Sequence, residues 1–378
     1  MKPIRKTPTS SLLDFLPYKL FNKYPLPFDN ASVFFTMNGR NAIFNALKLF
    51  DIDKESTVLL PAYHCTALVD PIIEYGTKIK FYTINKDLSV NFGEIEALIN
   101  GNTSVLLFVH FFGFPAPVKQ FAELSNKYNI ITIEDCSHTL FGSIQNKYIG
   151  TFGDVSIFSF RKILNVKDGG ALVVNKLSFK KNISFKIPPL QYQLRIVKWT
   201  LENPGWETPK NGSNPKENTN NMNLHSKNNI NKGPESQDDP HFFVEYANWS
   251  ISKISKFIFR QTNANSIVRK RRNNYNYLDS KVKKINRIKP CFSQIPDGVC
   301  PLGYPIIFDG DFRLDYLLRK NGVPAFSFGE ELDKSVDHNQ FPDAYYLSKN
   351  IVLLPIHQGL GKIELDEMYN IIKKNLHD

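Results

Sequence analysis

Strand-like and helix-like segments alternate between residues 30 and 175, and this alternation limits the possible folds more than any other feature. Residues 41–50 are apolar at helical spacing, whereas residues 104–112 form a nearly continuous apolar run, as in a strand buried on both faces. The pattern predicts an α/β fold with a large, mostly parallel sheet covered by helices, whose ligands bind at the carboxyl ends of the strands. The predicted strands are 57–61, 78–84, 104–112, 130–134, 155–160 and 171–175, and the predicted helices are 41–50, 66–75, 92–99 and 118–128.

The second half of the chain predicts a smaller domain. Residues 201–240 hold ten asparagines and few apolar side chains, so they cannot offset their ordering entropy. Further on, the pattern predicts helices at 267–288, 313–321 and 364–376 and strands at 303–307 and 351–355. We expect four parts: an N-terminal segment 1–28, a large domain 29–200, a disordered Asn-rich insertion 201–245, and a small α+β C-terminal domain 246–378 that includes the basic helix.

Composition excludes several classes of protein. With 42% hydrophobic and 22% charged residues among 378, the chain can build a core and is not disordered throughout. No apolar run approaches the roughly 20 residues of a membrane span, and no secretory signal is evident. The four cysteines match no zinc pattern and are too sparse for a disulfide framework. We therefore expect a cytoplasmic protein with no metal site and no membrane partner.

The net charge of +11 comes from one segment. Residues 251–290 hold twelve lysines and arginines and one acid, so the rest of the chain is neutral overall. A solvated helix face explains this segment better than contact with phosphates. Nucleic acid is an unlikely partner, since neither a recognisable motif nor an aromatic-basic pattern accompanies the charge.

Two motifs, at residues 36–41 and 133–138, contain side chains that could bind a ligand or take part in a reaction. In 36–41 (TMNGRN), Gly39 allows close approach to the backbone at a helix start, and Arg40 could add a guanidinium contact to an anion. A simple helix cap would explain the same residues. In 133–138 (IEDCSH), Asp135 ends a buried strand and could hold a protonated ring nitrogen, with His138 beside it. An N-cap is the alternative for Asp135.

Two more motifs follow. Lys162 comes at the end of another strand, in FSFRK, where burial and the neighbouring Arg161 could lower its pKa and make it a nucleophile toward carbonyl groups. An exposed lysine at a strand end is the alternative. Asp168, Gly169 and Gly170 indicate a tight turn, which a hairpin would explain equally well.

Taken in order, these motifs resemble those of the DegT/StrS sugar aminotransferases, which use pyridoxal phosphate (PLP) and have the aspartate-aminotransferase type of fold. The resemblance is dense over residues 36–175, moderate over 265–378 and absent over about 176–262. The matching stretches are NGRNAIFNAL, VLLPAYHC, LLFVHFFGFPAP, IEDCSHTLFGSIQNKYIGTFGD, FSFRKILNVKDGG and LLPIHQGL.

The resemblance implies roles for individual positions. Lys162 matches the lysine that bonds covalently to PLP and later moves a proton between substrate and cofactor. Asp135 matches the carboxylate that keeps the pyridine nitrogen protonated, so that the ring acts as an electron sink. His138 matches a Gln or His position beside the phenolic oxygen. Lys162 and Asp135 are thus the expected catalytic residues.

The resemblance also implies a phosphate site. Gly39 and Arg40 match the helix start that binds the cofactor phosphate, and Ser159 matches a serine that reaches the same group. The gap from Ser159 to Lys162 is two residues shorter than usual, which could let Arg161 share the phosphate.

Two departures affect other parts of the site. The aromatic residue that commonly stacks on the ring falls at Cys65, so His64 could stack instead, or Cys65 could simply pack. The Gly-x-Asn-x-Arg-like segment that often reaches across the dimer is not found. Among the remaining histidines, we expect His110 to be packed and His357 to have no catalytic role.

The function implied by the resemblance is transfer of an amino group, with glutamate as the expected donor, to a keto group on a nucleotide-linked sugar, by a homodimer. The product would feed polysaccharide or sugar-nucleotide biosynthesis, and residues 269–272 could attract the substrate's diphosphate. One alternative is another PLP reaction, such as dehydration or action on a non-sugar keto substrate. Relatives that dehydrate carry histidine in place of the lysine, so Lys162 favours amination. Another alternative is a non-catalytic protein that binds an acidic partner.

Overall fold

The computed structural model describes Ile4, Pro8 and residues 24–29, 32–176, 182–202 and 242–376. Most of the expected Asn-rich insertion, residues 203–241, lies outside the described residues. No helix among those described is long and apolar enough to cross a membrane.

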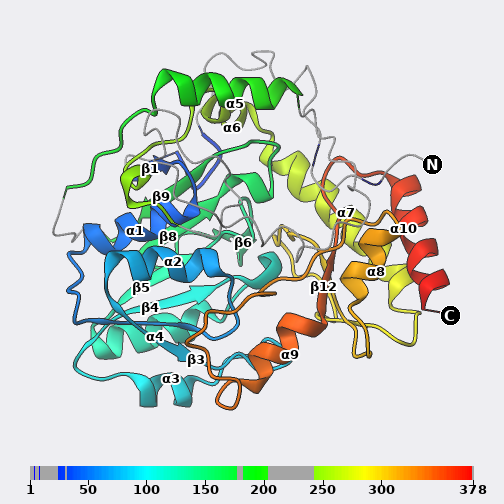
Figure 1. Cartoon of the computed structure of the whole chain (residues 1–378), viewed down its shortest axis with the longest axis horizontal. Helices are drawn as coiled ribbons and strands as arrows, with labels where there is room; N and C mark the ends of the chain where they lie inside the picture. Colours follow the sequence, from blue (N-terminus) through cyan, green and yellow to red (C-terminus); the bar gives the residue numbers. More distant parts are fainter. Residues whose placement is uncertain are drawn as a thin grey trace, which may run out of the picture.

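A seven-stranded sheet in the order β1-β9-β8-β5-β4-β2-β3 forms the centre of the larger part (Figure 1). The five strands from β8 to β3 are parallel, while β9 runs antiparallel between β8 and β1. The predicted mostly parallel sheet is therefore confirmed, with β1 as a strand that the sequence patterns did not predict. The strands are β1 (Val33–Thr36), β2 (Thr57–Pro61), β3 (Lys78–Tyr82), β4 (Thr103–Val109), β5 (Ile131–Asp135), β8 (Val155–Ser159) and β9 (Gly170–Val174).

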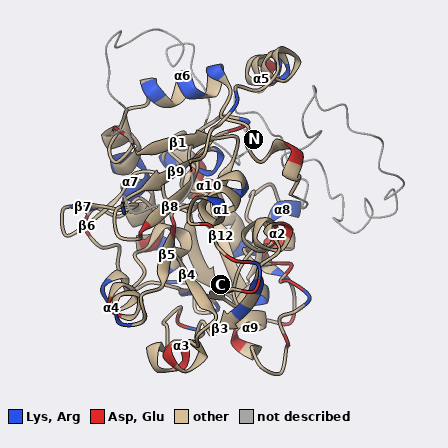
Figure 2. Ribbon diagram, turned by 90° about the vertical axis from the view of Figure 1, so that its left-hand side faces the viewer, with Lys and Arg blue, Asp and Glu red and all other residues tan. Residues whose placement is uncertain are grey.

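Helices cover the sheet on both faces. In Figure 2, α4 lies to one side of the strands, and α1 and α2 lie to the other. The Phe121 ring of α4 stacks on the Phe108 ring of β4 with centroids 4.6 Å apart, which anchors that layer. This three-layer arrangement is the predicted fold class. These helices are α1 (Gly39–Leu49), α2 (Thr66–Tyr75), α3 (Phe92–Leu98) and α4 (Val118–Tyr128).

Strand register brings the ends of several strands to one edge of the sheet. Asp135 at the end of β5 is level with Val109 of β4, and Ser159 at the end of β8 is level with Gly170 of β9. Gly170 also pairs with Thr36 at the end of β1. The motifs that are scattered over residues 36–170 in the sequence thus meet at this edge.

The paired glycines are required by close packing at this edge. Gly169 has φ +128°, and a Cβ on Gly170 would lie 2.5 Å from the backbone carbon of Asn38. The tight turn expected here is therefore present. The preceding Asp168 is buried and accepts hydrogen bonds from Ser252 N–H at 2.8 Å and from the Ser255 hydroxyl. It thereby ties α6 to the large sheet.

Residues 182–202 and 242–261 pack beside the large sheet. They contain α5 (Leu190–Glu202) and α6 (Lys253–Gln261), neither of which was predicted. Phe259 of α6 is buried against Phe160, with ring centroids 4.2 Å apart. The boundary predicted at 246 therefore falls within a segment that contacts the large sheet, and the division into domains stays a prediction.

The C-terminal part contains a three-stranded antiparallel sheet flanked by helices. The long basic helix is α7 (Ala264–Val282), which ends six residues before the predicted end at 288 because the chain turns so that Ile285 and Ile288 are buried. The other elements are β10 (Lys289–Pro290), β11 (Tyr304–Ile307), β12 (Ile351–Leu354), α8 (Leu314–Lys320), α9 (Pro342–Asn350) and α10 (Lys362–Asn375).

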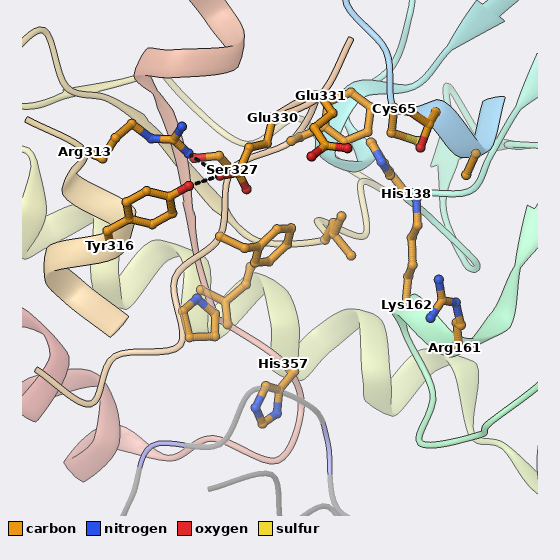
Figure 3. Close-up of a pocket in the computed structure, with 18 of the residues that line it drawn as sticks. Cys65, His138, Arg161, Lys162, Arg313, Tyr316, Ser327, Glu330, Glu331 and His357 are labelled. Atoms are coloured by element: carbon orange, nitrogen blue, oxygen red, sulfur yellow. Dashed lines mark hydrogen bonds and ion pairs between the residues drawn. The ribbon is translucent and has the colours of Figure 1, made fainter. Parts of the chain in front are cut away.

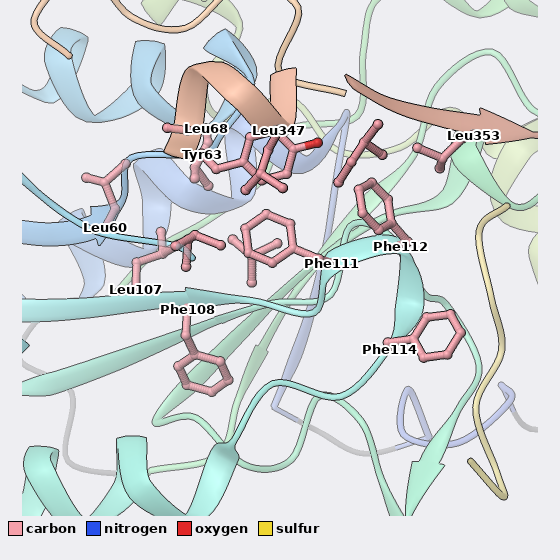
Figure 4. Packing of buried hydrophobic residues seen from close by; sticks show 14 of the residues in the cluster. Leu60, Tyr63, Leu68, Leu107, Phe108, Phe111, Phe112, Phe114, Leu347 and Leu353 are labelled. Carbon is pink, nitrogen blue, oxygen red and sulfur yellow. The ribbon is translucent and has the colours of Figure 1, made fainter. Parts of the chain in front are cut away.

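One cluster of buried hydrophobic side chains is continuous between the two sheets (Figure 4). It includes Leu107 and Phe111 from the large sheet and its strand end, and Leu347 and Leu353 from α9 and β12. The two sheets therefore share a core, and this holds the C-terminal loops over the strand ends.

Candidate active site

A cavity of about 1170 Å³ opens between the strand ends and the C-terminal part (Figure 3). A smaller inner chamber adjoins it, and Lys162, His138 and Cys65 line both. Asp135 lines the inner chamber. The outer wall comes from the C-terminal part and combines apolar side chains with the polar residues Arg313, Tyr316, Ser327, Glu330, Glu331 and His357.

Lys162 lies in the short 3-10 helix Phe160–Lys162 directly after β8, and is half-buried. Figure 3 shows its side chain extended toward His138. Burial lowers the pKa of the Lys162 amine; Cys65 and Asp135 oppose this, whereas the Arg161 and Arg40 charges reinforce it. The lysine is therefore not an exposed surface cation, and its amine loses its proton more readily than that of an exposed lysine.

Asp135 is buried at the end of β5, and its Oδ1 accepts a hydrogen bond from Ser137 N–H at 2.7 Å. Burial raises the pKa of the Asp135 carboxyl, and the positive charge of Lys162 counteracts the rise. A buried carboxylate is stable only with a positive partner. A cationic ligand in the inner chamber would supply that partner.

His138 is held as a neutral hydrogen-bond donor. Its Nδ1 accepts from Phe112 N–H at 3.1 Å, so the proton of the neutral ring is on Nε2. Burial and the nearby Lys162 charge hold the pKa of His138 well below its usual value. The ring also packs edge-on against Phe328, with centroids 4.6 Å apart. His138 can therefore donate to an oxygen acceptor without becoming charged.

The start of α1 lies at one end of the inner chamber. A Cβ added to Gly39 would lie 3.5 Å from Ser137 Oγ and 3.7 Å from Ser159 Cβ, so these three residues lie together. Arg40 and Arg161 line the same chamber, and no acid lies in the first turn of α1. Helix N–H groups, hydroxyls and two guanidiniums favour a phosphate. Ser137 was not predicted, although it directly follows Asp135 and Cys136 in a quoted motif.

The structure separates His64 from Cys65. The His64 ring is buried away from both chambers, stacked on Phe81 with centroids 5.2 Å apart, and its Nε2 accepts from Asp333 N–H at 3.1 Å. It therefore does not occupy the position from which it was expected to stack on a cofactor ring. Cys65, at the N-terminus of α2, does line both chambers.

The buried trio of His110, Glu134 and Cys136 is held by hydrogen bonds. Their potential ligand atoms lie within 4.8 Å of one another. His110 Nε2 lies 2.9 Å from Glu134 Oε1, and Glu134 also accepts from Gly150 N–H and Ser156 Oγ. These contacts use the carboxylate oxygens that a metal would need. His110 is packed, as expected, and contributes to the fold below the site.

A family model described as the DegT/DnrJ/EryC1/StrS aminotransferase family matches residues 28–223. The chain belongs to this family. Among curated relatives, it is 33% identical over 153 residues to GDP-perosamine synthase of Escherichia coli O157:H7, covering 39% of this chain and 42% of that protein. A Campylobacter jejuni UDP-4-amino-4,6-dideoxy-N-acetyl-beta-L-altrosamine transaminase is 32% identical over 127 residues, covering 32% of this chain and 34% of that protein. The matches thus span about two fifths or less of these relatives.

Solved structures of the family share the fold. Helicobacter pylori PseC, an aminotransferase involved in the biosynthesis of pseudoaminic acid, has a TM-score of 0.65 at 17% identity and covers 100% of this chain and 93% of that chain. A Streptococcus pneumoniae structure of a proposed sugar aminotransferase in its PLP form has a TM-score of 0.68 at 15% identity, covering 99% of each chain. At these identities, the likeness establishes the fold.

Proposed function

We propose that the protein is a PLP-dependent aminotransferase that transfers an amino group to a nucleotide-linked keto sugar. The observation that carries this proposal is that Lys162, Asp135 and the N-terminus of α1 face one inner chamber. Family membership gives the reaction class, and the chamber offers the three groups that such a reaction requires: a nucleophilic amine, a buried carboxylate and an anion site.

The chemistry of the inner chamber fits PLP. The phosphate would bind at the start of α1, held by Gly39, Ser137 and Ser159 with help from the arginines. Asp135 would receive the positive charge that its buried carboxylate requires, from a protonated ring nitrogen. His138 Nε2–H would donate to the phenolic oxygen, because its Nδ1 is already engaged by Phe112.

The residues of the chain would act on bound PLP in distinct ways. When bound, PLP supplies an aldehyde for amine exchange and a ring that accepts electrons from the substrate Cα–H bond. Lys162 would hold the cofactor covalently, release it to the donor amine and then carry the proton that leaves Cα. Asp135 would keep the ring nitrogen charged, and His138 would orient the phenolic oxygen.

The outer cavity supports a large, polar second substrate. Arg313 and Glu330 form an ion pair at 3.2 Å on its wall, and the Tyr316 hydroxyl donates to the same Glu330. Several named relatives act on GDP- or UDP-linked sugars. We infer a nucleotide-linked keto sugar as acceptor, glutamate as donor, and a cytoplasmic homodimer as the working form.

The half-reaction with the donor tests the proposal. Purified protein loaded with PLP should turn into the pyridoxamine form when glutamate is added, with loss of visible absorbance, and a UDP- or GDP-linked 4-keto sugar should reverse the change. The Lys162→Ala variant should show neither the conversion by glutamate nor its reversal by the keto sugar. If no amino donor converts the wild-type cofactor, the aminotransferase proposal is wrong, and the alternatives of other PLP chemistry or a non-catalytic binding protein follow.

A further inference from the structure

Arg271 is a buried cation without a counter-charge. It lies on α7 within the basic segment 251–290, where a solvated face was expected, yet only 1% of its surface is exposed. It forms no ion pair with any acid in the described part of the chain, and burial lowers its pKa to about 10. Keeping a charge buried in this way is costly. Its hydrogen bonds show what it holds together.

The Arg271 guanidinium joins three segments through neutral acceptors. Its Nη1 donates to the carbonyls of Pro301 and Leu302, both at 3.0 Å, and its Nε donates to Gln358 Oε1 at 2.9 Å. Its Nη2 lies 3.5 Å from the carbonyl oxygen of Ile163. Gln358 Nε2 donates to the same Ile163 oxygen at 2.9 Å. Arg271 and Gln358 therefore both donate hydrogen bonds to the carbonyl oxygen of Ile163, the residue directly after Lys162.

The same guanidinium is connected to the opposite side of the inner chamber. Leu302, whose carbonyl accepts from Arg271, donates its N–H to the Phe112 carbonyl at 2.8 Å. Phe112 N–H in turn donates to His138 Nδ1 at 3.1 Å. A continuous set of hydrogen bonds thus runs from His138 to Arg271 and on to Ile163.

We propose that Arg271 and Gln358 are positioning residues that set the place of Lys162 relative to His138, by holding the Ile163 carbonyl. This inference rests on the proposed function, because it assigns their effect to the reacting lysine. Both residues come from the C-terminal part. The position of the 3-10 helix Phe160–Lys162, at the edge of the large sheet, therefore depends on contacts outside that sheet. Displacement of a reacting group by about 1 Å can slow an enzyme roughly a hundredfold.

Three substitutions separate the contacts. Gln358→Glu keeps an acceptor for Arg271 Nε but loses the N–H that binds Ile163. Gln358→Leu loses both contacts at similar volume. Arg271→Lys keeps the charge but cannot span three segments, since an ammonium lacks the planar fork. The matched control is Arg272→Lys, because the neighbouring Arg272 also donates to loop carbonyls, at Pro296 and Val299, away from Ile163. The assay uses glutamate alone, so any attraction of a substrate diphosphate by Arg272 does not enter the measurement.

Each variant is loaded with PLP, checked for folding by thermal melting, and assayed in the glutamate half-reaction. We expect Gln358→Glu and Arg271→Lys to lower the single-turnover rate by about 10- to 100-fold while the apparent Kd for glutamate changes less than about threefold. The pH midpoint of the visible absorbance of PLP on Lys162 should shift in the same variants. Arg272→Lys should match the wild type within about twofold in both readouts.

The outcomes distinguish this proposal from the function on which it rests. If the wild-type protein never bonds PLP to Lys162, both the proposed function and the positioning role are wrong. A normal link in the wild type, with unchanged rate and pH midpoint in Gln358→Glu, Gln358→Leu and Arg271→Lys, would overturn the positioning role alone. A lower melting temperature without either change would likewise contradict it, because it would indicate a purely structural role.

Discussion

The two walls of the cavity are built in different ways. The inner wall consists of strand ends from one sheet, where register alone brings Asp135, Ser159 and Gly170 to one edge. The outer wall consists of loops around α8 and β12, which meet the inner wall through a shared apolar core and through hydrogen bonds such as that from Asp333 N–H to His64 Nε2. Local sequence patterns therefore determine the inner wall, which carries the candidate reactive groups. The wall that would select the substrate is set by contacts between distant segments.

The largest expected effect is at the inner wall. Asp135→Asn keeps the acceptor for Ser137 N–H but loses the charge, so a protonated ring nitrogen would lose its buried partner. Breaking such a pair costs about 3–5 kcal/mol, so we expect the rate of the glutamate half-reaction to fall by roughly a hundredfold to several thousandfold, at tenfold for each step of about 1.36 kcal/mol. Without PLP, the variant should melt no lower than the wild type, because burial raises the pKa of Asp135 and its charge opposes folding at neutral pH.

Stopped-flow absorbance and thermal melting check the two parts of this prediction. Asp154→Asn serves as a control, since Asp154 is a carboxylate near the opposite end of the same strands and accepts from Thr132 N–H at 2.7 Å. A half-reaction rate within tenfold of the wild type in Asp135→Asn would mean that the inner wall does not hold a cationic ring.

A second test concerns the contact that joins the walls, between His64 and the N–H of Asp333. Burial lowers the pKa of His64 to about 4. An unfolded histidine, with a pKa near 6.5, binds a proton first as pH falls. The stability from the neutral His64 is therefore present above about pH 6.5 and is lost progressively toward pH 4, by up to about 3 kcal/mol.

We expect His64→Gln to have a flatter pH profile of unfolding free energy than the wild type between pH 6.5 and 4. Urea unfolding at several pH values measures this difference. His138 is also buried and neutral, but it is present in both proteins, so the difference isolates His64. Parallel profiles would contradict the assignment of His64 as a neutral link between the walls.

A smaller effect is expected at the outer wall. Glu330 pairs with Arg313, and partly exposed ion pairs contribute about 0–1 kcal/mol. Glu330→Gln removes a negative charge from a cavity proposed to take a diphosphate, so we expect the KM for the nucleotide sugar to fall about two- to fivefold. Steady-state kinetics measure this change, and the control is Glu123→Gln, at an exposed position of α4. A change in PLP affinity instead would contradict the separation of roles between the walls.

The smallest effect on activity is expected for Cys65, which lines both chambers. Cys65→Ala should change the half-reaction rate less than about threefold, because the thiol lines the chamber and forms no hydrogen bond with another side chain in the described part of the protein. Iodoacetamide labelling read by mass spectrometry should modify Cys65 before Cys136 and Cys300, which are buried and have raised pKa values. Bound PLP should slow the labelling, and equal rates with and without PLP would place Cys65 outside the site.

Much of the inner wall could be predicted from the sequence because its elements have strong local patterns. The strand at 57–61 and the helices at 66–75 and 118–128 have the predicted bounds, since continuous apolar runs and helical spacing mark them clearly. The same patterns placed Lys162 and Asp135 at strand ends, and the structure brings them to one chamber.

The remaining features depend on contacts that local patterns do not contain. His64 and Cys65 are neighbours in sequence, yet only Cys65 lines the chambers, because packing on Phe81 determines where the His64 ring lies. Phe328 contacts His138 from almost 200 residues away in the chain. Arg271 lies in a segment whose charge predicts a solvated face, and only tertiary packing buries it.

The central claim is that Lys162 is the residue that holds PLP at the inner wall. The most direct measurement is to incubate the protein with PLP, reduce it with borohydride and map the modified peptide by mass spectrometry. A pyridoxyl group is expected on Lys162, and none on Lys167, which lies five residues further along the chain. Labelling elsewhere, or none at all together with no visible absorbance, would contradict the claim.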